Sequence, residues 1–167
     1  PNEEARQSLM DYLTGAYAAY PVDKTISLRG SMMKALLTGD AAVFETNIKE
    51  LFSNIPSQLH IKREAYYYSP LLLWLNMLGF HVEGEVSTSR GRVDAVWTWK
   101  ERAVIAEVKY AGCGALKTLL DTAMAQIEEH GCCGRYAATH RRVARLAVVF
   151  SGKRIGCYME ELSPNNA

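Results

Sequence analysis

The stretch GRVDAVWTWKERAVIAEVKY, residues 91–110, decides the fold, because its pattern predicts two strands joined by a tight turn. Apolar residues dominate both halves, which is typical of strands covered on both faces. Lys100 and Glu101 form a two-residue hairpin loop if Trp99 pairs with Arg102. The loop lacks the usual Asn-Gly turn signal, so a register shifted by one or two residues stays open.

Charged residues interrupt both predicted strands: Asp94 in the first, Glu107 and Lys109 in the second. An acid in an apolar strand costs several kcal/mol unless a partner or a metal compensates it. Glu107 and Lys109 share a strand face, because they are two residues apart. In the two-residue-loop register Asp94 lies opposite Glu107, with Cβ atoms about 4.5–5.5 Å apart. A slip of one residue would place the two acids on opposite faces.

Two facing carboxylates repel each other as bare anions and become stable when a divalent cation lies between them. Oxygen ligands favour Mg²⁺ or Mn²⁺. Such a cation lowers the pKa of a bound water and neutralises charge on a phosphate oxygen. Lys109 can polarise the attacking water and stabilise the pentacovalent phosphate. The set therefore suffices for phosphodiester hydrolysis, although spacing alone is explained equally well by a surface ion pair on an exposed sheet edge.

Periodicity in the flanking sequence supplies the remaining elements. The predicted strands are 81–87, 91–98, 102–109, 143–150 and 154–159. The predicted helices are 4–20, 27–37, 41–52, 57–79 and 115–130. Pro70 lies inside the 57–79 segment, so either that helix kinks or Ser69 caps a new one. This order predicts an α/β fold with a central mixed β-sheet of about five strands flanked by helices.

Length and composition fit one domain, or one domain with a small appendage. The chain has 167 residues, 49% hydrophobic and 22% charged, with a formal net charge of +1. These values exclude a disordered chain but leave both nucleic acid and small substrates open. No apolar run approaches the roughly 20 residues that span a bilayer. The start lacks the apolar core of a signal peptide, and Pro1 in place of Met is compatible with a fragment of a longer protein.

Four cysteines occur without a C-x-x-C pair. Adjacent Cys132 and Cys133, with His130 nearby, give only a weak zinc signal, because tetrahedral sites need better-spaced ligand pairs. Reduced thiols in a cytoplasmic protein are the ordinary interpretation.

Arginines and tyrosines offer possible contacts to nucleic acid. Arg90 and Arg92 precede the Asp94 strand and can reach phosphate, whereas the cluster at 141–145 is typical of a charged, solvated loop. The tyrosines at 66–68 could stack on bases, but aromatic residues beside an apolar helix more often belong to a core.

These residues resemble the PD-(D/E)xK nuclease superfamily, in Asp94 and the following run V-I-A-E-V-K at 104–109. The similarity covers about residues 55–160 and follows one branch, found C-terminal to an AAA-ATPase-like domain in many bacterial proteins. The segments that carry it are R-E-A-Y-Y-Y-S at 63–69, L-G-F at 78–80, S-R-G-R-V-D at 89–94, A-E-V-K at 106–109 and A-x-x-Q-I at 123–127.

The resemblance implies a restriction-endonuclease-like αβββαβ core at 57–162, preceded by an N-terminal helical extension at 1–56. It makes Asp94 and Glu107 metal ligands, with the Val108 carbonyl as a third, and Lys109 the catalytic lysine. Glu64 matches an acid that serves the metal or its water, and Gln126 matches a polar residue directed at the site. Val93 stands where the family pattern has Pro, a change that the superfamily tolerates.

The implied function is a Mg²⁺- or Mn²⁺-dependent nuclease acting on DNA. The implied partners are a covalently linked N-terminal AAA-ATPase-like domain and a second copy of the chain. A non-catalytic module that keeps the fold and binds nucleic acid or the ATPase domain is the alternative. An NTPase and a serine or cysteine hydrolase lack support, because the sequence contains neither G-x-x-x-x-G-K-[ST] nor G-x-S-x-G.

Overall fold

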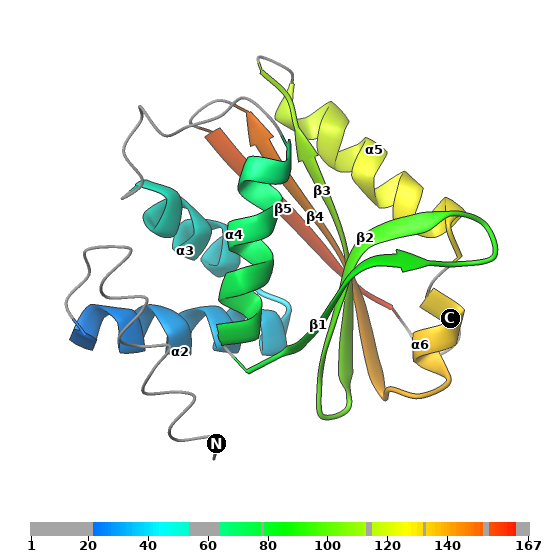
Figure 1. The fold of residues 1–167 in the computed structure, drawn as a ribbon, viewed down its shortest axis with the longest axis horizontal. Helices are drawn as coiled ribbons and strands as arrows, with labels where there is room; N and C mark the ends of the chain where they lie inside the picture. The colour runs from blue at the N-terminus through cyan, green and yellow to red at the C-terminus, as the bar shows by residue number, and fades with distance from the viewer. Residues whose placement is uncertain are drawn as a thin grey trace. The chain divides into compact units, whose positions relative to one another are not determined.

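The computed structural model describes residues 22–53, 64–77, 79–112, 115–131, 133–151 and 154–162 (Figure 1). Packing divides the chain into two compact units, Pro1–His60 and Ile61–Ala167. The predicted helix at 4–20 and the predicted boundary between residues 56 and 57 lie outside the described residues. None of the described helices is both long and apolar enough to cross a bilayer.

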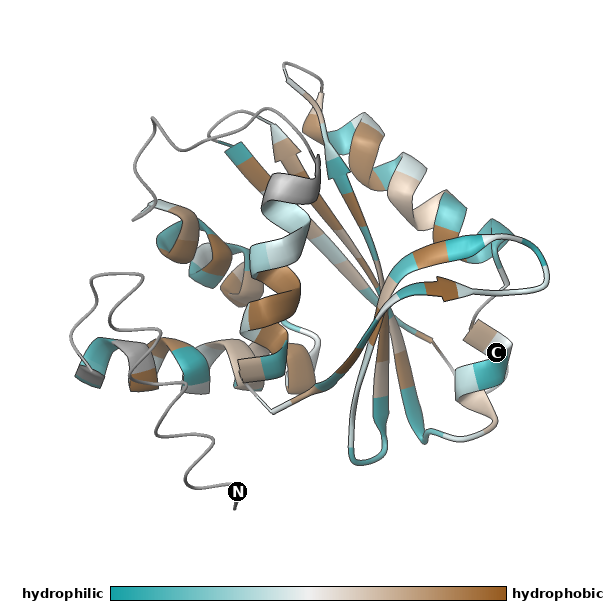
Figure 2. Cartoon of the chain, viewed as in Figure 1, coloured by the Kyte–Doolittle hydropathy of each residue, from teal (hydrophilic) through white to brown (hydrophobic). Residues whose placement is uncertain are grey.

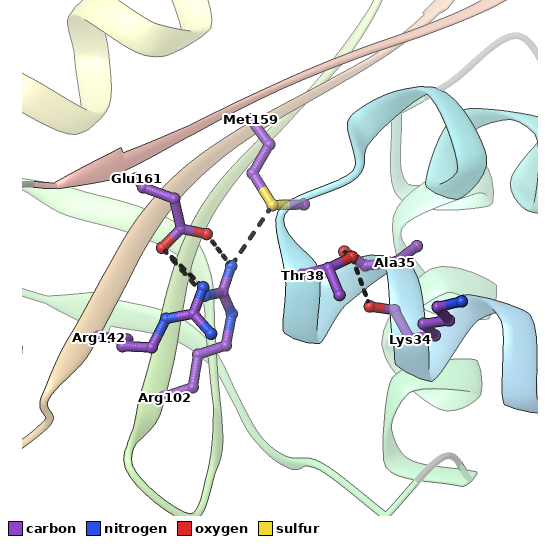
Figure 3. Close-up of polar contacts among 7 residues, drawn as sticks. All are labelled: Lys34, Ala35, Thr38, Arg102, Arg142, Met159 and Glu161. Atoms are coloured by element: carbon purple, nitrogen blue, oxygen red, sulfur yellow. Dashed lines mark hydrogen bonds and ion pairs between the residues drawn. The ribbon is translucent and has the colours of Figure 1, made fainter.

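The first unit contains two described helices, α2 (Val22–Thr38) and α3 (Ala41–Ser53), which confirm the predicted helices at 27–37 and 41–52. Gly39, with φ of 80°, ends α2, and the Asp40 side chain caps α3 by accepting a hydrogen bond from the Val43 N–H at 3.0 Å. At the end of α2 the Thr38 hydroxyl donates to the Lys34 carbonyl (2.9 Å; Figure 3). Buried apolar side chains recur at helical spacing along both helices: Leu28, Met32, Ala35, Leu36, Phe44, Ile48, Leu51 and Phe52.

The second unit is built on a five-stranded mixed sheet, which confirms the predicted α/β fold class. The strands are β1 (His81–Ser87), β2 (Arg92–Trp99), β3 (Arg102–Tyr110), β4 (Arg142–Ser151) and β5 (Arg154–Leu162). They lie in sequence order; β3 and β4 are parallel and the other neighbours antiparallel. All residues from 102 to 108 are buried, as expected of a central strand with both faces covered.

The helices of this unit are α4 (Glu64–Met77), α5 (Leu116–Glu129) and the short α6 (Cys133–Ala137). Tyr67 of α4 stacks on Phe150 of β4, with ring centroids 4.5 Å apart. Arg145, on the same strand, instead donates to Glu128 of α5 at 3.3 Å. Strand side chains alternate between faces, and Arg145 and Phe150 are an odd number of residues apart, so α4 and α5 cover opposite faces of the sheet.

A hydrophobic core lies between the sheet and α5. Ile127 of α5 and Tyr136 of α6 pack with apolar side chains from four strands: Val86, Val93, Val96, Ala103, Ile105 and Val143. In Figure 2 hydrophobic residues recur along β3, β4 and α5, in keeping with this packing.

The structure corrects one expectation about helices and adds one short helix. Residues 64–77 form a single helix with Pro70 inside it, so the alternative of a new helix capped by Ser69 is wrong. The helix α6 was not predicted, because five residues span little more than one turn and give no measurable period.

The predicted solvated loop at 141–145 is confirmed for exposed Arg141 and wrong for the residues that follow. Arg142 opens β4, and Arg145 lies within the strand with a side chain only 15% exposed. Its guanidinium donates to Glu160 at 2.7 Å as well as to Glu128, so two carboxylates compensate the charge.

Arg102 is a second buried cation, 3% exposed, at the start of β3. Its guanidinium donates to both carboxylate oxygens of Glu161, one of them at 3.0 Å (Figure 3). Arg142 lies 3.7 Å from the same carboxylate. A bidentate pair of this kind offsets the desolvation of a buried arginine.

Candidate active site

The register between β2 and β3 fixes which residues meet. The paired residues run from Ala95 with Ala106 to Trp99 with Arg102, which confirms the predicted two-residue loop. Lys100 has φ of 52°, the left-handed conformation that Asn or Gly usually supplies in such a turn. The register excludes a one-residue slip.

One step beyond the Ala95–Ala106 pair, acid side chains take over the hydrogen bonding between the strands. The Val108 N–H donates to Asp94 Oδ2 at 2.8 Å, and the Asp94 N–H donates to Glu107 Oε2 at 3.3 Å. Each acid therefore reaches the main chain of the opposite strand. The two acids therefore lie next to each other, just beyond the last regular pair of β2 and β3.

Burial makes the ionised form of this site costly. Glu107 is 3% exposed, and this burial raises the pKa of its carboxyl group, while the hydrogen bond from Lys109 acts in the opposite direction. Lys109 Nζ lies 2.7 Å from Glu107 Oε1. The ion pair is therefore present, but it lies on a central strand; the alternative of an exposed sheet edge is wrong for this pair.

The donor set fits a hard divalent cation. Each carboxylate oxygen has two lone pairs, so an oxygen that accepts one hydrogen bond can still bind a metal. Carboxylate oxygens are the ligands that Mg²⁺ and Mn²⁺ prefer. Within the described residues no third His, Cys, Asp or Glu side chain completes a metal-binding group. Glu64 opens α4, but its side chain lies outside the described part, so its ligand role stays a prediction, as does that of the Val108 carbonyl.

Gln126 lies on α5, the helix that covers the face carrying Glu107 and Lys109. Its Oε1 is buried and has no hydrogen-bond partner among the described residues. Its neighbour Ile127 packs in the same core cluster as Val93, which precedes Asp94. A buried amide oxygen without a donor costs free energy, so a donor from water or substrate would fit there; the catalytic role of Gln126 stays a prediction.

Arg90 and Arg92 are exposed at the start of β2. Arg92 lies 3.4 Å from Glu85, and both side chains are more than half exposed. Such a surface pair is weak, so Arg92 can leave Glu85 and bind a phosphate group. Arg90 is exposed and can bind phosphate as well. Their nucleic-acid role stays a prediction.

Tyr68 contacts the site in a way that sequence reasoning missed. Its hydroxyl donates to the backbone carbonyl of Asp94. Tyr67, in contrast, is a core residue, 3% exposed and stacked on Tyr110 and Phe150. The signal for Tyr68 was Gly84, because a glycine inside a strand often marks a close approach.

A model of the PD-(D/E)XK nuclease superfamily matches residues 62–160 of the chain. The chain belongs to this superfamily. The match spans α4, the whole sheet except the last residues of β5, and α5. Members of the superfamily usually use divalent metals, in keeping with the oxygen ligands that this site offers.

A protein described as uncharacterised, from the region 5′ of vnfD in Azotobacter chroococcum mcd 1, is 26% identical over 156 residues. The match covers 90% of this chain and 29% of that protein. The chain therefore spans less than a third of the length of this curated relative.

Proposed function

We propose that this member of the PD-(D/E)XK superfamily is a metal-dependent nuclease that hydrolyses phosphodiester bonds in DNA. One observation carries the proposal. Asp94 and Glu107 each accept a hydrogen bond from a main-chain N–H of the opposite strand, and Lys109 Nζ lies 2.7 Å from Glu107 Oε1. Two carboxylates can bind a metal ion, and an ammonium group beside them can stabilise the negative charge that develops in phosphoryl transfer.

Each side chain has a distinct role in this proposal. Asp94 and Glu107 would hold Mg²⁺ or Mn²⁺, which supplies Lewis acidity and lowers the pKa of water when bound. Lys109 opposes the burial that raises the pKa of Glu107 and can orient the attacking water. Its charge also stabilises the phosphate as negative charge accumulates there. Glu64 and Gln126 are assigned supporting contacts to the metal or its water.

The setting of the chain is part of the same proposal. Segments at 63–69 and 89–94 resemble the branch that carries an N-terminal AAA-ATPase-like domain, and the curated relative is much longer than this chain. A homodimer would allow both strands of a duplex to be cut. A cytoplasmic location is proposed from the cysteines, of which Cys133 is a free thiol.

Substitution of Lys109 tests the catalytic proposal. We expect Lys109→Ala to slow metal-dependent cleavage by about 100- to 1000-fold, the usual effect of removing one group that stabilises transition-state charge. The measurement is cleavage of plasmid, single-stranded DNA and RNA with Mg²⁺ or Mn²⁺. Lys117→Ala, an exposed lysine on α5, is the matched control and should cleave normally. Equal cleavage by Lys109→Ala would reject the assignment.

Asp94→Asn serves in the same experiment as the metal-binding variant. Loss of partners outside the ligand shell already costs about 10- to 100-fold in metal affinity, so loss of a ligand charge should weaken Mn²⁺ binding at least as much. Asp121→Asn, exposed on α5, is the calorimetric control. Nucleic-acid binding without cleavage by the unchanged protein would instead identify a non-catalytic module.

A further inference from the structure

The main chain of Asp94 has lost its regular strand partners on both sides. Toward β3, the regular pairs end at Ala95. Toward β1, Gly84 pairs with Ala95 and Val86 with Val93, but the intervening pair of Glu85 with Asp94 is missing. Glu85 has φ of 53°, a conformation that turns its peptide away from the ladder geometry. Other groups must therefore satisfy the Asp94 peptide.

The Tyr68 hydroxyl fills the gap between β1 and β2. It donates to the Asp94 carbonyl and lies close to the backbone of Glu85. One hydroxyl thus lies against both residues whose direct pairing is missing. A tyrosine hydroxyl, with an ordinary pKa of about 10, is protonated at neutral pH and able to donate.

Gly84 leaves the space that this hydroxyl occupies. A Cβ atom at Gly84 would lie 2.9 Å from the Tyr68 hydroxyl oxygen and 3.3 Å from Leu72 Cδ1. Any larger residue at this position would push the tyrosine away from the strands. The position of the Tyr68 hydroxyl therefore depends on the absence of a side chain at Gly84.

We propose that Tyr68 is a positioning residue that holds the main chain of Asp94 so that its carboxylate faces Glu107. This inference rests on the proposed function, in which Asp94 binds the metal. Asp94 is held at three points: its carbonyl by Tyr68, its N–H by Glu107 and its carboxylate by the Val108 N–H. Without the first contact, the peptide can rotate and carry the carboxylate away from its partner.

The test is Tyr68→Phe, which removes the hydroxyl and keeps the ring. We expect Mn²⁺ affinity, measured by calorimetry, to fall about tenfold, the lower end of the usual effect of contacts behind a metal ligand. The Mn²⁺ concentration for half-maximal cleavage should rise by the same factor, and the rate at saturating Mn²⁺ should recover. A merely structural tyrosine would not move the metal dependence. Tyr158→Phe, 50% exposed on β5, is the matched control.

A double-mutant cycle with Gly84→Ala tests the route of the effect. Gly84→Ala alone should also weaken Mn²⁺ binding, because the added methyl group displaces the hydroxyl. In the Tyr68→Phe background the same change should have little further effect, since the hydroxyl is already gone. Losses that simply add would overturn the proposed coupling.

A measurement on the metal-free protein separates this inference from the proposed function. Tyr68→Phe should shift the carbonyl ¹³C resonance of Asp94 and the amide resonance of Glu85, and Tyr158→Phe should leave both unchanged. If the unchanged protein binds no Mn²⁺, the proposed function fails and these shifts decide the positioning role. If it binds Mn²⁺ and Tyr68→Phe binds equally well, the positioning role fails and the proposed function stands.

Discussion

Glu107 makes the stability of the metal-free protein depend on pH. Burial raises its pKa in the folded state above the value in the unfolded chain, despite the hydrogen bond from Lys109. The folded state then binds the proton more tightly, so the free energy of unfolding falls as pH rises from the unfolded pKa through the folded one. We expect Glu107→Gln, which does not titrate, to lose this slope in urea denaturation with a chelator between pH 4 and 8 (range chosen about the ordinary carboxyl pKa).

The exposed Glu129→Gln on α5 controls for the loss of one acid. It should keep the pH slope of the unchanged protein. A constant difference in unfolding free energy between the unchanged protein and Glu107→Gln, at every pH, would contradict the raised pKa.

At the same scale, the sequence was informative only where spacing controls geometry. The proximity of Asp94 and Glu107 could be predicted from a two-residue loop, because each step along one strand is matched by a step along the other. Gly84 signals a close approach to its strand, but its partner Tyr68 could not be predicted, because the contact depends on the loss of one strand pair that neither composition nor spacing reveals. The Arg102–Glu161 pair joins residues 59 positions apart, a contact that only the sheet order brings about.

At the scale of elements, the strands were predictable because they combine apolar runs with breaks at glycine, proline or charged residues. The β1 bounds agree with the prediction at both ends, and β5 extends to Leu162 beyond the predicted end at residue 159. Residues 160–162 continue β5 by pairing with β4, an interaction between distant segments that the local pattern does not contain.

The β1–β2 hairpin, which contains Arg90 and Arg92, lies beside the C-terminal end of α5 (Figure 1). The Thr88 hydroxyl donates to the His130 carbonyl at 2.7 Å, which fastens the hairpin to the helix. A Cβ atom at Gly91 would lie 2.5 Å from the His130 ring, so the hairpin and the histidine are closely packed. These contacts hold the hairpin, and with it Arg90 and Arg92, against α5 at the start of the strand that contains Asp94.

If both arginines contact phosphate, their removal should change the salt dependence of DNA binding. Each phosphate contact on duplex DNA contributes about 0.9 to the slope of log affinity against log salt concentration. We expect Arg90→Ala with Arg92→Ala to reduce the slope by about 1.8, measured by fluorescence anisotropy without a catalytic metal. The double variant Lys24→Ala with Lys34→Ala removes two exposed charges from α2 and should leave the slope unchanged. An unchanged slope for the arginine variant would remove these residues from the interface.

At the scale of the whole molecule, the order of elements was enough to predict the fold class. Strands before and after α5 imply a crossover, and β3 and β4 are indeed parallel. The division of the chain is a different matter. The predicted domains, 1–56 and 57–162, stay predictions, while packing separates Pro1–His60 from Ile61–Ala167. Composition gives no sharp boundary there, since both sides are helical in pattern.

All described site residues lie in the unit Ile61–Ala167, so this unit should bind the metal without residues 1–60. Asp94, Glu107 and Lys109 all lie in Ile61–Ala167, as do Tyr68 and Val108, which hydrogen-bond to Asp94. Groups that share no partners couple by only about 0.3–0.5 kcal/mol, a factor of about two in affinity. We therefore expect residues 61–167, produced alone, to bind Mn²⁺ with an affinity within about twofold of that of the whole chain. Circular dichroism checks that the fragment is folded; a folded fragment that binds no Mn²⁺ would show that residues 1–60 contribute to the site.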